Sequence, residues 1–180
     1  MQDNSFQTIR LPMIALRGLS VFPGMLLTFD VERPASVAAL GIAGKNEQLI
    51  FLAAQKDLSV DVPGEEDIYE VGTVCRVRQQ LRQPRGTICR VMVEGLYRAV
   101  SVSLDTDPKG YMAELRPLPD RAERVSADRM QALVRNCVSL YDEYLHMNQD
   151  LPSEQILNLL SNPRPDYVAY YIAQNMQLSV

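Results

Sequence analysis

The stretch YEVGTVCRVRQQLRQPRGTICRVMVEGLYRA, residues 69–99, decides the fold. Side chains suited to a core alternate with charged ones over its first half: Val71, Thr73, Cys75 and Val77 on one face, Arg76 and Arg78 on the other. A period of two residues indicates a strand, here 71–81. A second strand is expected over 87–94, and the segment Gln-Pro-Arg-Gly at 83–86 between them is typical of a turn. The stretch therefore predicts an antiparallel hairpin.

The segments before the hairpin also indicate β structure. Strands are expected over 8–17 and 25–31, separated by the turn Phe-Pro-Gly at 22–24. Pro34 suits the first turn of a short helix. The apolar run 48–54 is too short for an independent helix and fits a strand buried on both faces.

After the hairpin the β pattern continues and then changes. Strand character extends over 96–104 and 111–115, with a turn at 105–110. Beyond Pro117 the apolar period becomes 3.6 residues, which predicts helices. The apolar face of the first is expected to hold Met130, Leu133, Val134, Cys137, Tyr141, Tyr144 and Leu145.

Capping residues and prolines set the expected limits of the helices. Ser126 is a cap for the first helix and Ser153 for a second through Leu160, while Pro165 begins a third. Strands followed by helices indicate an α+β fold. We expect a β subdomain over 1–118 with one short helix, and an all-helical subdomain over 119–180 that continues beyond this sequence.

Composition and charge exclude several functions. With 18 basic and 22 acidic residues, the net charge is −4 and no block of basic residues stands out. Nucleic acid is not an expected partner, because phosphate binding draws on clustered lysine and arginine. No apolar stretch approaches the roughly 20 residues of a membrane-spanning helix. The polar amino terminus resembles no signal peptide, so a cytoplasmic protein without membrane contact is expected.

The cysteines and the single histidine do not predict a metal or catalytic site. Cys75, Cys89 and Cys137 lack ligand spacing, and His146 has no partner at such a spacing. We expect the thiols to act as small buried hydrophobic groups. A turn near Pro84 also means that Cys75 and Cys89 are not cross-strand partners. No paired acid and base supports an independent enzyme.

Four segments in this order resemble the amino-terminal domain of Lon proteases: LPMIALRGLSVFPGM at 11–25, FLAAQKD at 51–57, YEVGTVCRVRQ at 69–79 and VMVEGLYRA at 91–99. The helical tail continues the resemblance more weakly. Gly18 and the Pro-Ala pair at 34–35 depart from the residues common in the family.

The resemblance implies a PUA-like pseudo-barrel followed by helices, in front of an AAA+ ATPase module and a Ser-Lys protease module. ATP and Mg would belong to that ATPase, since this sequence has no phosphate-binding loop and no cofactor of its own is expected. The implied role is non-catalytic: recognition of unfolded or degradation-tagged proteins and assembly of a homo-hexameric serine protease that degrades misfolded and regulatory proteins. The alternative is a stand-alone Lon-domain module that binds a peptide or small ligand. RNA binding rests on fold analogy alone.

Recognition of unfolded chains needs exposed apolar surface. The candidate client-contacting residues lie at the first turn, at the helix start and at the hairpin tip: Phe22, Pro23, Met25, Leu27, Arg33 and Leu81. The competing interpretation places Met25 and Leu27 in the core with Phe22 closing its end. Tyrosines of the helical tail are expected to pack within it, with stacking between subunits as the alternative.

Overall fold

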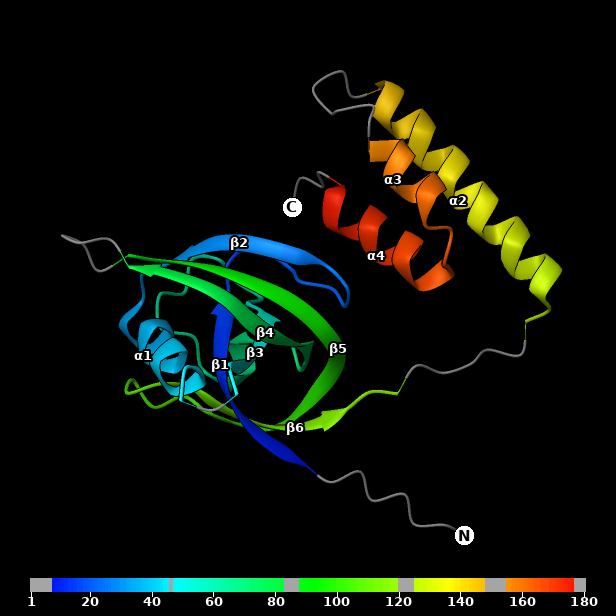
Figure 1. Ribbon diagram of the computed structural model, residues 1–180. Coiled ribbons are helices and arrows are strands. Elements are labelled where there is room, and N and C mark those ends of the chain that lie inside the picture. Colours follow the sequence, from blue (N-terminus) through cyan, green and yellow to red (C-terminus); the bar gives the residue numbers. More distant parts are fainter. Residues whose placement is uncertain (1–7, 46, 83–87, 120–124, 148–154, 177–180) are drawn as a thin grey trace, which may run out of the picture. The chain divides into compact units, whose positions relative to one another are not determined.

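The computed structural model describes residues 8–45, 47–82, 88–119, 125–147 and 155–176 (Figure 1). These residues belong to two units, 1–119 and 120–180. The first unit contains β1 (Ile9–Leu16), β2 (Leu26–Val31), α1 (Pro34–Ala43), β3 (Leu49–Ala54), a 3-10 turn (Glu65–Asp67), β4 (Val71–Arg82), β5 (Cys89–Asp105) and β6 (Met112–Pro117). The second contains α2 (Ala127–Met147), α3 (Gln155–Ser161) and α4 (Pro165–Asn175). The chain is therefore β-rich with a few helices.

The six strands form one curled sheet in the order β2-β5-β4-β3-β1-β6. The long strand β5 pairs with β4 and β2 and also, through its second half, with β6, so the sheet bends back on itself (Figure 1). β1 and β3 are parallel, and the other strand pairs are antiparallel. β2 lies at one end of the order and, among the residues that the structure describes, pairs only with β5.

The predicted hairpin is confirmed by the pairing of β4 with β5, although its expected turn at 83–86 lies outside the described residues. Cys75 lies opposite Gly95, so the two cysteines of the hairpin are not partners. The side chain of Val71 is 47% exposed, because it lies at the start of β4 beyond the core. Val74, on the opposite face of the strand, is fully buried.

Two apolar clusters lie on opposite faces of β1, β3 and β4. One cluster contains Ile14, Ile50 and Cys75 together with α1, and the other contains Met13, Phe51 and Val74. Because successive side chains of a strand point to opposite faces, β3, which contributes to both clusters, is apolar throughout. The prediction that the 48–54 strand is buried on both faces is confirmed.

The helical unit has a small core of its own, which centres on Tyr141, Leu145, Leu159 and Val168. The rings of Tyr141 and Tyr144 stack at a centroid distance of 5.8 Å, within one chain as expected. Ser126 caps α2, since its Oγ accepts a hydrogen bond from the Arg129 backbone N–H at 3.4 Å. The proposed cap Ser153 lies outside the described residues.

The predicted apolar face of α2 needs one correction. Leu133 is 48% exposed and Cys137 is also exposed. Val134 packs against the core of the helical unit as predicted, and Val138, which was not among the predicted residues, does so as well. An apolar residue one position away from the contact stripe is rotated by about 100° and faces outward. The expectation of three buried thiols therefore holds for Cys75 and Cys89 only.

Candidate functional site

The six predicted client-contacting residues lie in three separate places. Those from Phe22 to Leu27 surround the start of β2, Arg33 follows its end, and Leu81 lies on β4 opposite Arg90. On its other side, Arg90 of β5 pairs with Asp30, near the end of β2, whereas Leu26 at the start of β2 pairs with Glu94. Leu81 is therefore level with the end of β2 and not with the first turn. The structure does not bring these residues together.

The first turn is held against β5 by backbone contacts. Gly24 has φ +76°, its N–H donates to the Gly95 carbonyl at 2.8 Å, and the Gly95 N–H donates to the Met25 carbonyl at 2.9 Å. A Cβ on Gly95 would lie 2.2 Å from the Phe22 carbonyl oxygen. The close approach of these two chains therefore requires glycine at 95.

Side chains around this turn differ in exposure. Met25 is only 8% exposed, and Leu27 packs against the core, as the competing interpretation holds. Phe22 and Pro23 are half-buried. Leu26 is 63% exposed and was not among the predicted residues, although alternation along β2 places it opposite to Met25 and Leu27.

Two adjoining hollows lie beside the turn, and we refer to them together as the turn groove. One holds about 200 Å³ and includes Phe22, Val71 and Arg98. The other holds about 540 Å³ and includes Lys56, Tyr69 and Val71. Both include Ser20, Ala54 and Val71, so they are continuous.

The walls of the turn groove combine apolar and cationic groups. Tyr69 is 53% exposed, and the Lys56 ammonium lies 5.9 Å from the centroid of its ring. The buried Thr73 hydroxyl donates to the Val21 carbonyl at 2.6 Å and fixes the loop that forms one wall. The groove can bind an apolar segment by contact, while Lys56 and Glu70 place charges of both signs on its walls.

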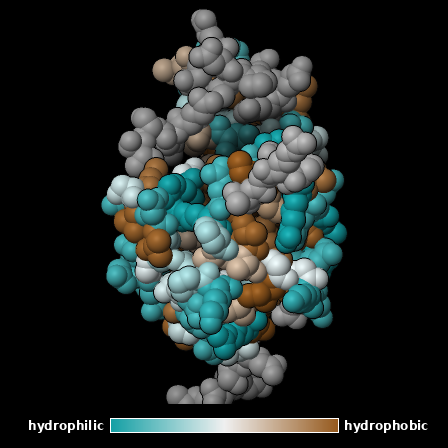
Figure 2. Space-filling view, turned by 90° about the vertical axis from the view of Figure 1, so that its left-hand side faces the viewer, coloured by the Kyte–Doolittle hydropathy of each residue, from teal (hydrophilic) through white to brown (hydrophobic). Residues whose placement is uncertain are grey.

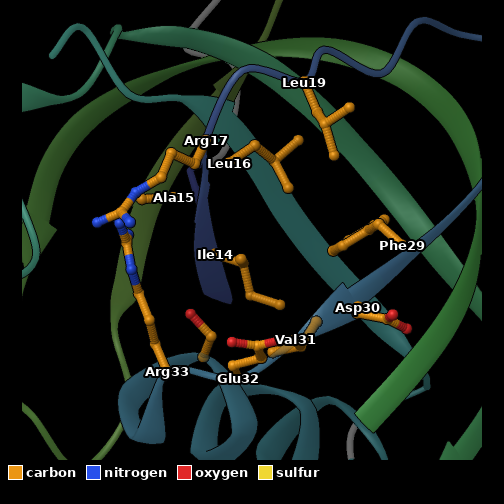
Figure 3. A pocket seen from close by; sticks show the side chains of 11 residues that line it. Ile14, Ala15, Leu16, Arg17, Leu19, Phe29, Asp30, Val31, Glu32 and Arg33 are labelled. Carbon is orange, nitrogen blue, oxygen red and sulfur yellow. The ribbon is translucent and has the colours of Figure 1, made fainter. Parts of the chain in front are cut away.

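Arg33 lines a third hollow, of about 200 Å³, between the end of β1, the end of β2 and the start of α1 (Figure 3). Its guanidinium donates two hydrogen bonds to Gln55 Oε1, each of 3.0 Å. Desolvation lowers the pKa of Arg33, and the nearby charge of Arg17 adds to this effect. Arg33 is thus a partly buried cation at the edge of a pocket rather than part of the turn groove.

The described residues hold no group of three or more histidine, cysteine or acidic side chains arranged to bind a metal. Burial raises the pKa of the Cys75 thiol above its ordinary value, which makes it a poor nucleophile. In the same part of the chain, no helix has the length and apolar character to cross a membrane.

The solved amino-terminal domain of the Lon protease of the Mycobacterium avium complex has a similar fold, with a TM-score of 0.74 and 19% identity over 95% of this chain and 85% of that one. The Lon protease of Syntrophomonas wolfei is 39% identical over all of this chain and 22% of that relative. Lon protease 1 of Bacillus subtilis is 34% identical over 94% of this chain and 22% of that relative. The chain thus spans about a fifth of the length of these relatives. The model of the Lon (ATP-dependent protease La) substrate-binding domain matches residues 10–180, and the chain therefore belongs to that family.

Proposed function

We propose that this chain is the non-catalytic client-recognition domain of a cytoplasmic Lon-type protease. The parent would be an ATP-dependent serine endopeptidase, with ATP and Mg bound in a separate AAA+ module. Its clients would be unfolded or degradation-tagged proteins. Membership in the Lon substrate-binding family supports this role, and the curled six-stranded sheet agrees with a PUA-like fold.

The observation that carries the proposal is the exposed apolar surface of the turn groove. Tyr69 is 53% exposed, and Val71, which lines both hollows, is 47% exposed. Apolar side chains are what an unfolded chain exposes and a folded one hides. Burying such side chains in the groove removes apolar area from water on both partners.

The apolar surface on the face shown in Figure 2 is divided rather than continuous. Figure 2 shows one face on which hydrophobic residues form separate patches among hydrophilic ones. Separate small patches favour weak binding at each site, and several subunits in a ring would then add avidity. We infer that selectivity for unfolded clients depends on many weak contacts.

The helical unit supports a role in subunit assembly. On α2, Leu133, Cys137, Leu140 and Met147 are exposed, at spacings of four, three and seven residues. Such spacing places them along one stripe of the helix, as in helix-to-helix interfaces. We propose that this stripe packs against another Lon subunit in a homo-hexamer.

Client recognition can be tested by fluorescence anisotropy with a labelled protein in its unfolded and folded forms, at two salt concentrations. We expect preference for the unfolded form that changes little with salt. The variant Val71→Ser should weaken this binding several-fold. The matched control is Leu81→Ser, because Leu81 lies on the same strand and is similarly exposed, at 54%, but lines neither hollow.

Two results would contradict the proposal. Equal binding of folded and unfolded forms would remove the role in client recognition. An equal loss in the Val71 and Leu81 variants would remove the turn groove as its site. For assembly, light scattering should show less self-association of Leu140→Ser than of Val102→Ser, whose residue is similarly exposed on β5.

A further inference from the structure

The pocket that Arg33 lines has an apolar interior and a cationic end. Figure 3 shows Ile14, Leu19 and Phe29 pointing into it from different segments, with the guanidinium groups of Arg17 and Arg33 side by side at one end. Its volume of about 200 Å³ is below the roughly 300–1,000 Å³ of small-molecule sites. The size suits one amino-acid residue better than a cofactor.

The two arginines carry more positive charge than their surroundings neutralise. Arg17 bonds the Asp61 carboxylate at 2.8 Å and the Val60 carbonyl at 3.0 Å. Arg33 bonds Gln55 and the Val60 carbonyl, and it forms no ion pair within the described part of the chain. One carboxylate therefore serves two guanidinium groups, and a second anion would be attracted to this end of the pocket.

A hydroxyl group lies at the same place. Ser36 lines the pocket from the first turn of α1 and is 8% exposed. Its hydroxyl forms no hydrogen bond among the described residues. The first turn of α1 contains no acidic side chain, so the positive end of the helix dipole is not offset locally. An anionic ligand would accept a hydrogen bond from the Ser36 hydroxyl and would be attracted by the helix dipole.

Two acidic residues also line the pocket. Asp30 is held by Arg90 through two hydrogen bonds of 2.7 Å each. Glu32 is exposed, and Figure 3 shows its carboxylate beside Val31, away from the guanidinium pair. The carboxylate of Glu32 therefore repels an anionic ligand from the far side of the pocket. Its removal should strengthen anion binding.

We infer that this pocket binds the carboxyl-terminal end of a client chain, with the free α-carboxylate at the guanidinium pair and an apolar last side chain in the interior. This inference rests on the proposed client recognition and specifies one class of client. A terminal carboxylate satisfies Arg17, Arg33 and the Ser36 hydroxyl, while an apolar side chain fits against Ile14 and Phe29.

The test compares fluorescently labelled peptides of one apolar sequence ending in leucine, with either a free carboxylate or a carboxamide, by anisotropy with the full chain. We expect the acid to bind roughly fivefold more tightly, as for a partly exposed charged contact. Arg17→Gln should remove the preference, and Ser36→Ala should reduce it. Glu32→Gln should increase it, which a misfolded variant would not do. The charge-matched control is Arg116→Gln on β6, which should leave the preference unchanged.

Each other outcome has a definite meaning. Equal binding of acid and amide would overturn the inference and leave the proposed function intact. Binding of neither peptide, with no binding of unfolded protein, would overturn both. A carboxamide peptide that ends in glutamate carries the same charge on a side chain. If it bound as tightly as the acid, the assignment to a chain terminus would be wrong.

Discussion

Replacing Gly95 with alanine tests whether the first turn is fixed by its contact with β5. The added methyl would lie 2.2 Å from the Phe22 carbonyl oxygen and 3.3 Å from Pro23 Cα, so the turn must move. Overpacking of this kind costs about 1–3 kcal/mol. Weakening the two backbone hydrogen bonds between Gly95 and residues 24 and 25 adds about 1 kcal/mol. We expect a loss of about 2–4 kcal/mol in the free energy of unfolding.

The matched control is Gly41→Ala, the same chemical change in the interior of α1. A Cβ at Gly41 meets no atom within 4 Å. Alanine is favoured over glycine inside a helix by roughly 0.5–1 kcal/mol, so this variant should be more stable than the wild type. Urea unfolding followed by far-UV circular dichroism measures both changes. The reasoning fails if Gly95→Ala unfolds within about 0.5 kcal/mol of the wild type, a difference near the error of such extrapolations.

Three further predictions concern single contacts. Thr73→Val removes the hydrogen bond to the Val21 carbonyl and should lower the free energy of unfolding by about 1–2 kcal/mol in the same urea experiment. In native protein, a thiol reagent should modify the exposed Cys137 quickly and the buried Cys75 only after denaturant is added; rapid labelling of Cys137→Ser would contradict this. Burial raises the pKa of Tyr141 to about 12, against about 10 in an unfolded chain. Its neutral form therefore contributes stability that is present below about pH 10 and is lost as the pH rises towards 12. Alkaline urea titrations should show a smaller loss for Tyr141→Phe than for the wild type.

Features that depend on neighbouring residues were predictable from the sequence. The hairpin follows from alternation on either side of a turn, and α4 begins at Pro165 as the sequence indicates. The parallel pairing of β1 with β3 and the pairing of β2 with β5 were not predictable, because they join segments far apart in the chain. The exposure of Val71 at the start of β4 was not predictable either, since an alternating pattern does not show where the core ends.

In the candidate site, too, the features set by neighbouring residues were predictable and the long-range contacts were not. Alternation along β2 is enough to place Leu26 opposite to Leu27, so the exposed residue could have been found from the pattern alone. The environment of Arg33 could not have been found from the sequence pattern. Its partner Gln55 is 22 residues away in the chain, and Arg17 and its partner Asp61 are 44 residues apart. No local pattern marks two arginines that meet across a fold.

The position of β2 links the two surfaces. Because β1 and β3 are buried on both faces, a client chain can contact this unit only at its loops and at the ends of its strands. The turn groove adjoins the start of β2, and the arginine pocket adjoins its end. Gly95 lies against Phe22 and Pro23, beside the turn groove. The arginine pocket is farther along β5, because Val31 at the end of β2 pairs with Cys89 whereas Leu26 at its start pairs with Glu94. Gly95→Ala should therefore weaken binding of unfolded protein while the preference for a terminal carboxylate persists. Loss of both together would mean that one continuous surface, and not two, receives the client.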